Sequence, residues 1–128
     1  MDPRRLTLPH RYGYAVLESG AADVRVAHFP GIERVGAGLV KYDLERGTSE
    51  VRRFAPQGGV GEAVFVPAGP DAAEDDGWLM AYVFDPDRDA TDLVLLDARD
   101  FTGEPVARVH LPVRVPVGFH GAWIPDRE

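Results

Sequence analysis

The sequence predicts an all-β protein built from short antiparallel strands. No stretch has apolar residues spaced three and four apart for longer than about two helical turns, as an amphipathic helix requires. Fourteen glycines and eleven prolines divide the 128 residues into short pieces, and such punctuation favours strands and turns over long helices. Between the turn signals, short runs rich in β-branched and aromatic residues recur along the chain, as in an all-β fold.

Seven runs of residues are expected to form these strands. They are Tyr12–Leu17, Gly38–Asp43, Ser49–Phe54, Glu62–Pro67, Trp78–Phe84, Asp92–Asp97 and Glu104–His110. Gly47 lies between the second and third runs and can supply the positive φ of a short bulged turn, which predicts a hairpin. The fifth run is nearly all apolar, as in a strand buried on both faces, and the seventh alternates like a half-exposed strand. A sandwich, a barrel and propeller blades are all compatible with this pattern.

Charge and composition exclude several functions. The net charge of −7, with Lys41 as the one lysine, argues against a nucleic-acid or anionic membrane partner. The absence of cysteine excludes disulfides, thiol catalysis and thiolate metal sites. No apolar run is long enough to span a bilayer, and the first residues lack the apolar core of a signal peptide. We therefore expect a soluble, cytoplasmic protein that binds no nucleic acid and has no membrane span.

Histidines are the first candidates for chemistry, because neutral imidazole is a common ligand of iron, copper and zinc. The chain has four, namely His10, His28, His110 and His120. The first two are expected to be solvated loop residues, and the third, at the end of a strand, to have a structural role. His120 differs because the glycines at positions 118 and 121 would let its backbone pass close to other groups, as a metal ligand requires. One histidine by itself makes no metal site, so a structural role stays open for His120 as well.

Glu62 is the second candidate, since it opens the apolar run that ends at Pro67. A carboxylate there could accept the second N–H of a ligating imidazole and so fix its tautomer. The alternative is a solvent-facing residue before the strand. The acidic run Ala73–Gly77 lacks the ligand spacing of a calcium loop and is expected to be a solvated connector. No phosphate-binding glycine loop, nucleophile elbow or zinc-protease motif is present, so nucleotide and hydrolase functions have no support.

Seven segments of the sequence together resemble the carotenoid oxygenase family, which includes carotenoid cleavage dioxygenases, stilbene-cleaving dioxygenases and the visual-cycle isomerase. In order along the chain they are Arg11–Ala15, Leu39–Leu44, Gly61–Pro67, Glu74–Leu79, Leu95–Ala98, Val106–Pro112 and Arg114–Gly121. Each segment is short, and their common order across nearly the whole chain carries the resemblance.

The resemblance implies a seven-bladed β-propeller with Fe(II) on its axis, held by four histidines from different blades. Enzymes of this kind use O₂ to cleave a conjugated double bond of an apolar substrate. The family's last iron ligand lies in a Gly-Phe-His-Gly context, which His120 matches. A supporting glutamate of the family lies in a Gly-Glu-Pro-x-Phe-Val-Pro context, which Glu62 matches. The resemblance therefore implies that His120 is an iron ligand and that Glu62 is hydrogen-bonded to its far nitrogen.

The sequence also departs from the family pattern. Ala63 replaces a usual proline, and Ala122 replaces a common asparagine. The other three histidines lie in no ligand motif of the family. We therefore expect one partial domain, residues 1–128, formed by the final blades of a propeller and carrying one of the four iron ligands.

Two functions stay open. In the first, the chain is the C-terminal part of an Fe(II)-dependent dioxygenase that acts with O₂ on a carotenoid, apocarotenoid or stilbene-type substrate. It would be inactive in isolation, because a single imidazole does not hold iron stably. In the second, it is a non-catalytic β-module that forms homo-oligomers through uncovered blade faces. Trp78, Phe84 and Phe65 are the candidates for that uncovered surface.

Overall fold

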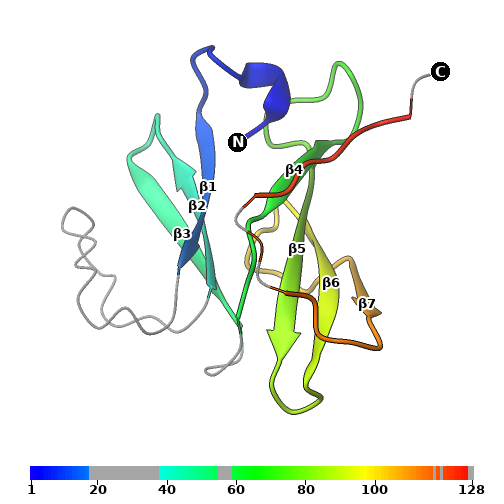
Figure 1. Cartoon of the computed structure of the whole chain (residues 1–128). Helices are drawn as coiled ribbons and strands as arrows, with labels where there is room; N and C mark the ends of the chain where they lie inside the picture. Colours follow the sequence, from blue (N-terminus) through cyan, green and yellow to red (C-terminus); the bar gives the residue numbers. More distant parts are fainter. Residues whose placement is uncertain (18–37, 55–58, 117, 119, 127–128) are drawn as a thin grey trace.

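The computed structural model describes residues 1–17, 38–54, 59–116, 118 and 120–126. Within these ranges it contains one short 3-10 helix and seven strands (Figure 1). The elements are η1 (Pro3–Arg5), β1 (Tyr12–Leu17), β2 (Gly38–Asp43), β3 (Thr48–Arg53), β4 (Val64–Pro67), β5 (Gly77–Asp85), β6 (Ala90–Asp97) and β7 (Ala107–His110). All seven predicted strands are present, although β4 and β7 begin later than expected. In the described part of the chain, no helix has the length and apolar character needed to cross a membrane.

The strands form two antiparallel sheets in chain order. β1, β2 and β3 make one sheet, and β4, β5, β6 and β7 make the other. β2 pairs along its full length with both neighbours. In the second sheet the longest pairing joins β5 to β6, from Trp78 opposite Asp97 to Asp85 opposite Ala90. Consecutive antiparallel strands need only short connections, which explains the many turn residues. The all-β, antiparallel prediction is confirmed.

The hairpin between β2 and β3 has the predicted turn. Gly47 has a φ of +65°, a left-handed conformation that glycine adopts without a Cβ clash. A Cβ at this position would meet nothing within 4 Å. The glycine is therefore required by the backbone conformation of the turn and not by crowding.

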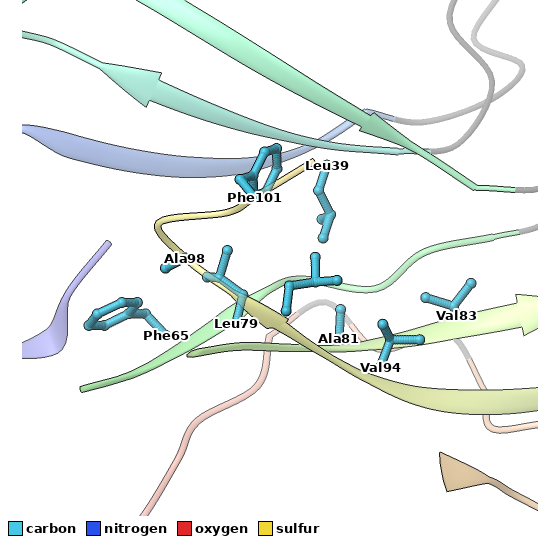
Figure 2. Packing of buried hydrophobic residues seen from close by; sticks show 9 residues of the cluster. Leu39, Phe65, Leu79, Ala81, Val83, Val94, Ala98 and Phe101 are labelled. Carbon is cyan, nitrogen blue, oxygen red and sulfur yellow. The ribbon is translucent and has the colours of Figure 1, made fainter. Parts of the chain in front are cut away.

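The hydrophobic core lies between the two sheets (Figure 2). Its buried members are Leu39, Phe65, Leu79, Ala81, Val83, Val94, Leu96, Ala98 and Phe101. The first belongs to β2, and the others belong to the second sheet and the loop after β6. The Tyr14 ring of β1 stacks on Phe65, with ring centres 5.9 Å apart and planes 8° apart. The two sheets share one core because each must bury an apolar face against the other.

Strand β5 is buried on one face only, so the prediction of burial on both faces is wrong. Successive side chains of a strand point to opposite faces. Leu79 on the core face is 0% exposed, whereas Trp78 is 37% and Tyr82 49% exposed on the other face. The expectation that Phe65 lies on an uncovered surface is also wrong, because it is 2% exposed and faces the first sheet. Phe84, the third candidate, is half-buried.

The acidic run is part of the fold, so the prediction of a solvated connector is wrong. Oε1 of Glu74 accepts the backbone N–H groups of Arg11 and Tyr12 at 2.7 and 2.8 Å. Oδ2 of Asp75 lies 3.2 Å from Nζ of the buried Lys41. These bonds connect the first sheet to the loop that leads into β5. The carboxylates are paired because a buried charge without a partner is costly.

Candidate functional site

The C-terminal tail follows β7 and carries the main candidate residue, and its described residues are 111–116, 118 and 120–126. It crosses the outer face of the second sheet and continues toward β4 (Figure 1). The N–H of Thr91 in β6 donates to the carbonyl of Val113 at 3.2 Å. The guanidinium of Arg114 lies over the ring of Phe84 in β5, 4.4 Å from its centre. The first residues of the tail are therefore attached to the sheet near the β5–β6 turn.

The two predicted site residues, Glu62 and His120, lie next to each other. Oε2 of Glu62 is 3.4 Å from Nδ1 of His120, and the same oxygen accepts the backbone N–H of Gly121 at 2.9 Å. The side chain of His120 is 88% exposed and that of Glu62 is 43% exposed. The carboxylate therefore faces Nδ1 of the imidazole, and the Nε2 edge of the ring is open.

Glycine at position 121 permits this approach of the tail to the sheet. A Cβ on Gly121 would lie 3.2 Å from Cγ2 of Val64, the first residue of β4. That distance is shorter than an optimal contact between carbon atoms. A Cβ on Gly118 would meet nothing within 4 Å. Close packing thus accounts for one of the two glycines that flank His120, and nothing in the described residues accounts for the other.

An apolar groove lies beside His120, between the tail and the outer face of the second sheet. Its volume is about 360 Å³. Its apolar lining includes Val64, Met80, Tyr82, Phe84, Leu93 and Trp123. Glu62 and His120 belong to the same lining. Apolar walls with a few polar groups are typical of sites for small molecules. The groove can therefore accept an apolar molecule next to an exposed imidazole.

The other histidines lie elsewhere. Nδ1 of His110 is 2.9 Å from Oδ1 of Asp92, a carboxylate that is 1% exposed. This contact gives His110 the structural role that was expected, with a side chain as its partner. Nδ1 of His10 is 3.4 Å from the carbonyl of Leu8, and the residue is half-buried where a solvated one was expected. His28 lies outside the described residues.

Asp92 is the centre of a charged cluster where the tail begins. Besides His110, its carboxylate binds Nη1 of Arg108 at 3.0 Å and Nη2 of Arg88. Burial raises the pKa of Asp92, but the hydrogen bonds from His110, Arg108 and Arg88 outweigh burial, so the pKa lies below its ordinary value. The ionised carboxylate therefore holds β6 to β7, the strand from which the tail departs.

The described residues do not form a complete metal site around His120. Among the residues that the structure describes, no three histidine, aspartate or glutamate side chains are grouped so that they could hold a metal ion. His120 offers one imidazole nitrogen. A single imidazole binds a transition metal weakly, so further ligands would have to come from outside the described residues.

The family of this chain follows from a comparison with known protein families. The sequence model of the family described as "RPE65: Retinal pigment epithelial membrane protein" matches residues 1–125. The chain belongs to the RPE65/carotenoid oxygenase family. The match includes both Glu62 and His120, and it confirms the family resemblance that the seven sequence segments predicted.

Members of the family with known activities resemble most of this chain. The chain is 40% identical over 123 residues to apocarotenoid-15,15'-oxygenase of Synechocystis sp. and 44% identical over 124 residues to carotenoid cleavage oxygenase of Mycobacterium tuberculosis. It is 32% identical over 128 residues to lignostilbene-alpha,beta-dioxygenase isozyme III of Sphingomonas paucimobilis. These matches cover 96%, 91% and 96% of this chain, but 23%, 22% and 25% of the relatives. The chain thus spans about a quarter of the length of the curated relatives it matches.

Solved structures of the family share the fold of this chain. The cobalt-substituted apocarotenoid oxygenase (ACO) of Synechocystis matches with a TM-score of 0.80 and 33% identity, covering 98% of this chain and 24% of that one. An ACO/RPE65 chimera matches with a TM-score of 0.78 and 32% identity, over the same shares of the two chains. These neighbours are propeller enzymes. The fold is therefore that of a partial propeller, as the family resemblance implied.

Sequence reasoning identified neither Thr91, which binds the tail, nor Asp92, which binds the strand before it. Thr91 and Asp92 stand at the start of β6, where the sequence indicates only the beginning of a strand. Their partners come from β7, the β5–β6 turn and the tail. One signal was available for Asp92, because a carboxylate next to the apolar run Leu93–Leu96 is a candidate for a buried and paired charge. No comparable signal points to Thr91.

Proposed function

We propose that this chain supplies an iron-ligating histidine, His120, and its supporting carboxylate, Glu62, to an oxygenase that cleaves a conjugated double bond. The observation that carries the proposal is the 3.4 Å distance between Oε2 of Glu62 and Nδ1 of His120. A carboxylate at one nitrogen of an imidazole favours the tautomer that leaves the lone pair of the other nitrogen free for a metal. Family membership supports the same assignment.

The described residues fit Fe(II) as one part of a larger ligand set. Imidazole is a suitable ligand for iron, and the exposure of His120 leaves its Nε2 accessible. One structural neighbour is a cobalt-substituted enzyme, which supports a metal centre in this fold. When bound, the iron would be the group that reacts with O₂. The other ligands implied by the family resemblance would come from histidines of further blades, and this chain in isolation is not expected to bind iron stably.

The proposed substrate is an apolar polyene or a stilbene-type molecule. The relatives named above are a carotenoid cleavage oxygenase, an apocarotenoid oxygenase and a lignostilbene dioxygenase. The groove beside His120 offers apolar and aromatic walls, including Met80, Phe84 and Trp123. Such walls bind flat, apolar molecules by removing their surface from water. The cytoplasmic location expected from the sequence stays a prediction.

A chimera tests the proposal. This chain would replace the matching quarter of the Synechocystis apocarotenoid oxygenase, and the solved ACO/RPE65 chimera is a precedent for combining two family members in one protein. We expect the purified chimera to contain stoichiometric iron by metal analysis and to cleave an apocarotenoid. His120→Ala should remove most of the iron and of the activity, whereas the control His10→Ala should retain both. Full iron content in the His120→Ala chimera would refute the assignment.

Glu62→Gln in the same chimera isolates the supporting role of the carboxylate. The amide keeps the shape of the side chain and removes its charge. Loss of a group that orients a ligating histidine typically weakens metal affinity by roughly tenfold to a hundredfold, so we expect at least about tenfold weaker iron binding in a chelator competition. The control is Glu104→Gln, an exposed glutamate before β7. Unchanged iron affinity in Glu62→Gln would mean that Glu62 does not act on His120.

A second candidate function is a non-catalytic β-module that self-associates. It is favoured by the outer face of the second sheet, where Trp78, Tyr82 and Val109 are 37%, 49% and 48% exposed. Exposed apolar surface of this kind favours association. Sedimentation of the metal-free chain tests this candidate. An oligomer that Tyr82→Lys converts into a monomer would support it, and a monomeric wild-type chain would exclude it.

A further inference from the structure

Thr91, the second residue of β6, binds the tail at three points. Its N–H donates to the carbonyl of Val113 at 3.2 Å, and its carbonyl accepts the N–H of Leu111 at 3.0 Å. Its hydroxyl Oγ1 accepts the N–H of Val115 at 2.9 Å. Thr91 is 2% exposed, so water competes little for these groups. The two backbone bonds are available to almost any residue, whereas the third exists because position 91 carries a hydroxyl.

The hydroxyl of Thr91 acts on the tail a short distance before His120. Val115 precedes His120 by five positions, and five residues reach at most about 18 Å. Beyond His120, the N–H of Gly121 is bonded to the carboxylate of Glu62. Among the described residues, these are the side-chain bonds to the tail backbone on either side of His120. His120 thus lies between two anchored positions of the tail. The hydroxyl of Thr91 holds the first, Val115, and the carboxylate of Glu62 holds the second, Gly121.

A second contact supports the same anchor. Phe84 lies directly opposite Thr91 in the pairing of β5 with β6. The guanidinium of Arg114 lies 4.4 Å from the centre of the Phe84 ring, a distance at which a cation is attracted to the face of the ring. Since Arg114 immediately precedes Val115, the cation–π contact and the hydroxyl bond fix neighbouring residues of the tail.

We propose that Thr91 is a positioning residue for His120, and that its hydroxyl holds Val115 so that the imidazole meets Glu62. The importance of this position for iron rests on the proposed function of His120, but the positioning itself does not. Valine would keep the shape of Thr91 without the acceptor, and serine would keep the acceptor. The hydroxyl can therefore be tested separately from the volume of the side chain.

The test uses the full 128-residue chain, labelled with ¹⁵N and ¹³C and studied by NMR without metal. In Thr91→Val we expect the amide of Val115 to exchange with solvent roughly fivefold faster, because one net hydrogen bond is lost. The amide of Gly121 should also exchange faster, and cross-peaks between the His120 ring and the Glu62 side chain should weaken. Thr91→Ser should restore all three signals. Exchange in β2 and β5 should stay unchanged, which separates positioning from a general loss of structure.

Two further variants make the outcome decisive. Thr102→Val, at an exposed threonine after β6, should change none of these signals. Val115→Pro removes the donor from the tail without a substitution in the sheet, so it decides the question even where Thr91→Val does not fold. Wild-type exchange at Gly121 with wild-type cross-peaks in Val115→Pro, or in folded Thr91→Val, would overturn the proposal. Because no iron is present, this result is independent of iron binding by the chimera.

Discussion

Two irregular segments, the acidic loop of residues 71–76 and the C-terminal tail, use their polar side chains in opposite ways. Glu74 in the loop is half-buried and holds the backbone at the start of β1. His120 in the tail is 88% exposed and has the carboxylate of Glu62 beside it. Polar groups with partners inside the chain thus stabilise the fold, while an imidazole with an open edge is available to a group from outside.

Burial explains why the loop is the more firmly held of the two segments. It lies against the first sheet and η1, where Nη2 of Arg4 donates to the carbonyl of Ala73 at 3.3 Å. Nη2 of Arg99 lies 3.2 Å from Oδ1 of Asp76 on its other side. The tail instead covers part of an otherwise open sheet face. Substitutions in the loop should therefore change stability, and substitutions in the tail should change chemistry.

The largest effect is expected in the core, which sets the scale for both segments. Leu79→Ala should lower the free energy of unfolding by about 2–5 kcal/mol, because it leaves a cavity at a fully buried position. The matched control is Leu44→Ala, at a leucine that is 56% exposed, and it should cost less than about 1 kcal/mol. Urea denaturation measures both. Equal losses would contradict a core shared by the two sheets.

The second-largest loss of stability is expected in the acidic loop. Glu74→Ala removes the acceptor of two backbone N–H groups and should cost about 1.5–3 kcal/mol, the range for hydrogen bonds to a charged group. Asp71→Ala, at an exposed position of the same loop, should cost less than about 0.5 kcal/mol. The same denaturation experiment compares them. A Glu74→Ala variant as stable as Asp71→Ala would show that the loop is a solvated connector after all.

Acid should weaken the charged cluster around Asp92, which lies where the tail begins. Because the pKa of Asp92 is lowered from its ordinary value of 3.8, its ionised form contributes stability that is complete above that value. This contribution is lost as the pH falls through the pKa of the folded state. Asp92→Asn should lower the free energy of unfolding by about 1–3 kcal/mol at neutral pH. Below about pH 4 the difference between wild type and variant should shrink, because the wild-type carboxylate becomes protonated while its arginine partners keep their charge.

Urea titrations over a pH series measure this difference. Asp85→Asn is the control, since Asp85 shares Arg88 with Asp92 but is far more exposed. A wild-type advantage over Asp92→Asn that stays constant in strong acid would contradict the role assigned to the carboxylate.

The smallest effect on stability should come from the candidate ligand itself. His120→Ala should change the free energy of unfolding by less than about 0.5 kcal/mol, because the side chain is 88% exposed. Urea denaturation of the metal-free chain is the measurement, beside the iron content of the chimera. A loss as large as that of Glu74→Ala would remove the contrast between loop and tail.

The strands were predictable because their signals are local. Alternation, β-branched residues and turn residues marked all seven, and Gly47 marked the hairpin through its own backbone conformation. Burial was less predictable. The apolar run of β5 did not show that Tyr82 would be half-exposed, and the acidic run did not show that Glu74 would bind the start of β1. Both outcomes depend on which segments pack against the run.

The residues of the candidate site were also predictable only in part. The sequence contexts of Glu62 and His120 singled out both residues, and the resemblance implied that they would be neighbours. Thr91 was not predicted, because a threonine at the start of a strand is ordinary and its importance lies in its bond to Val115. A hydroxyl acceptor acquires a role only when the fold brings a donor to it.

Local pattern and motif in the sequence were enough to predict the all-β class, the positions of the strands and the family, and to single out Glu62 and His120 as candidate site residues. The tertiary structure alone decided that the acidic loop stabilises the fold, that β5 buries one face, and that Thr91 and Glu62 bind the tail on either side of His120. The physical reason is that burial and hydrogen bonding depend on partners distant in the chain. Fifty-eight positions separate Glu62 from His120 (120 minus 62), and only the folded sheet brings the carboxylate to the imidazole.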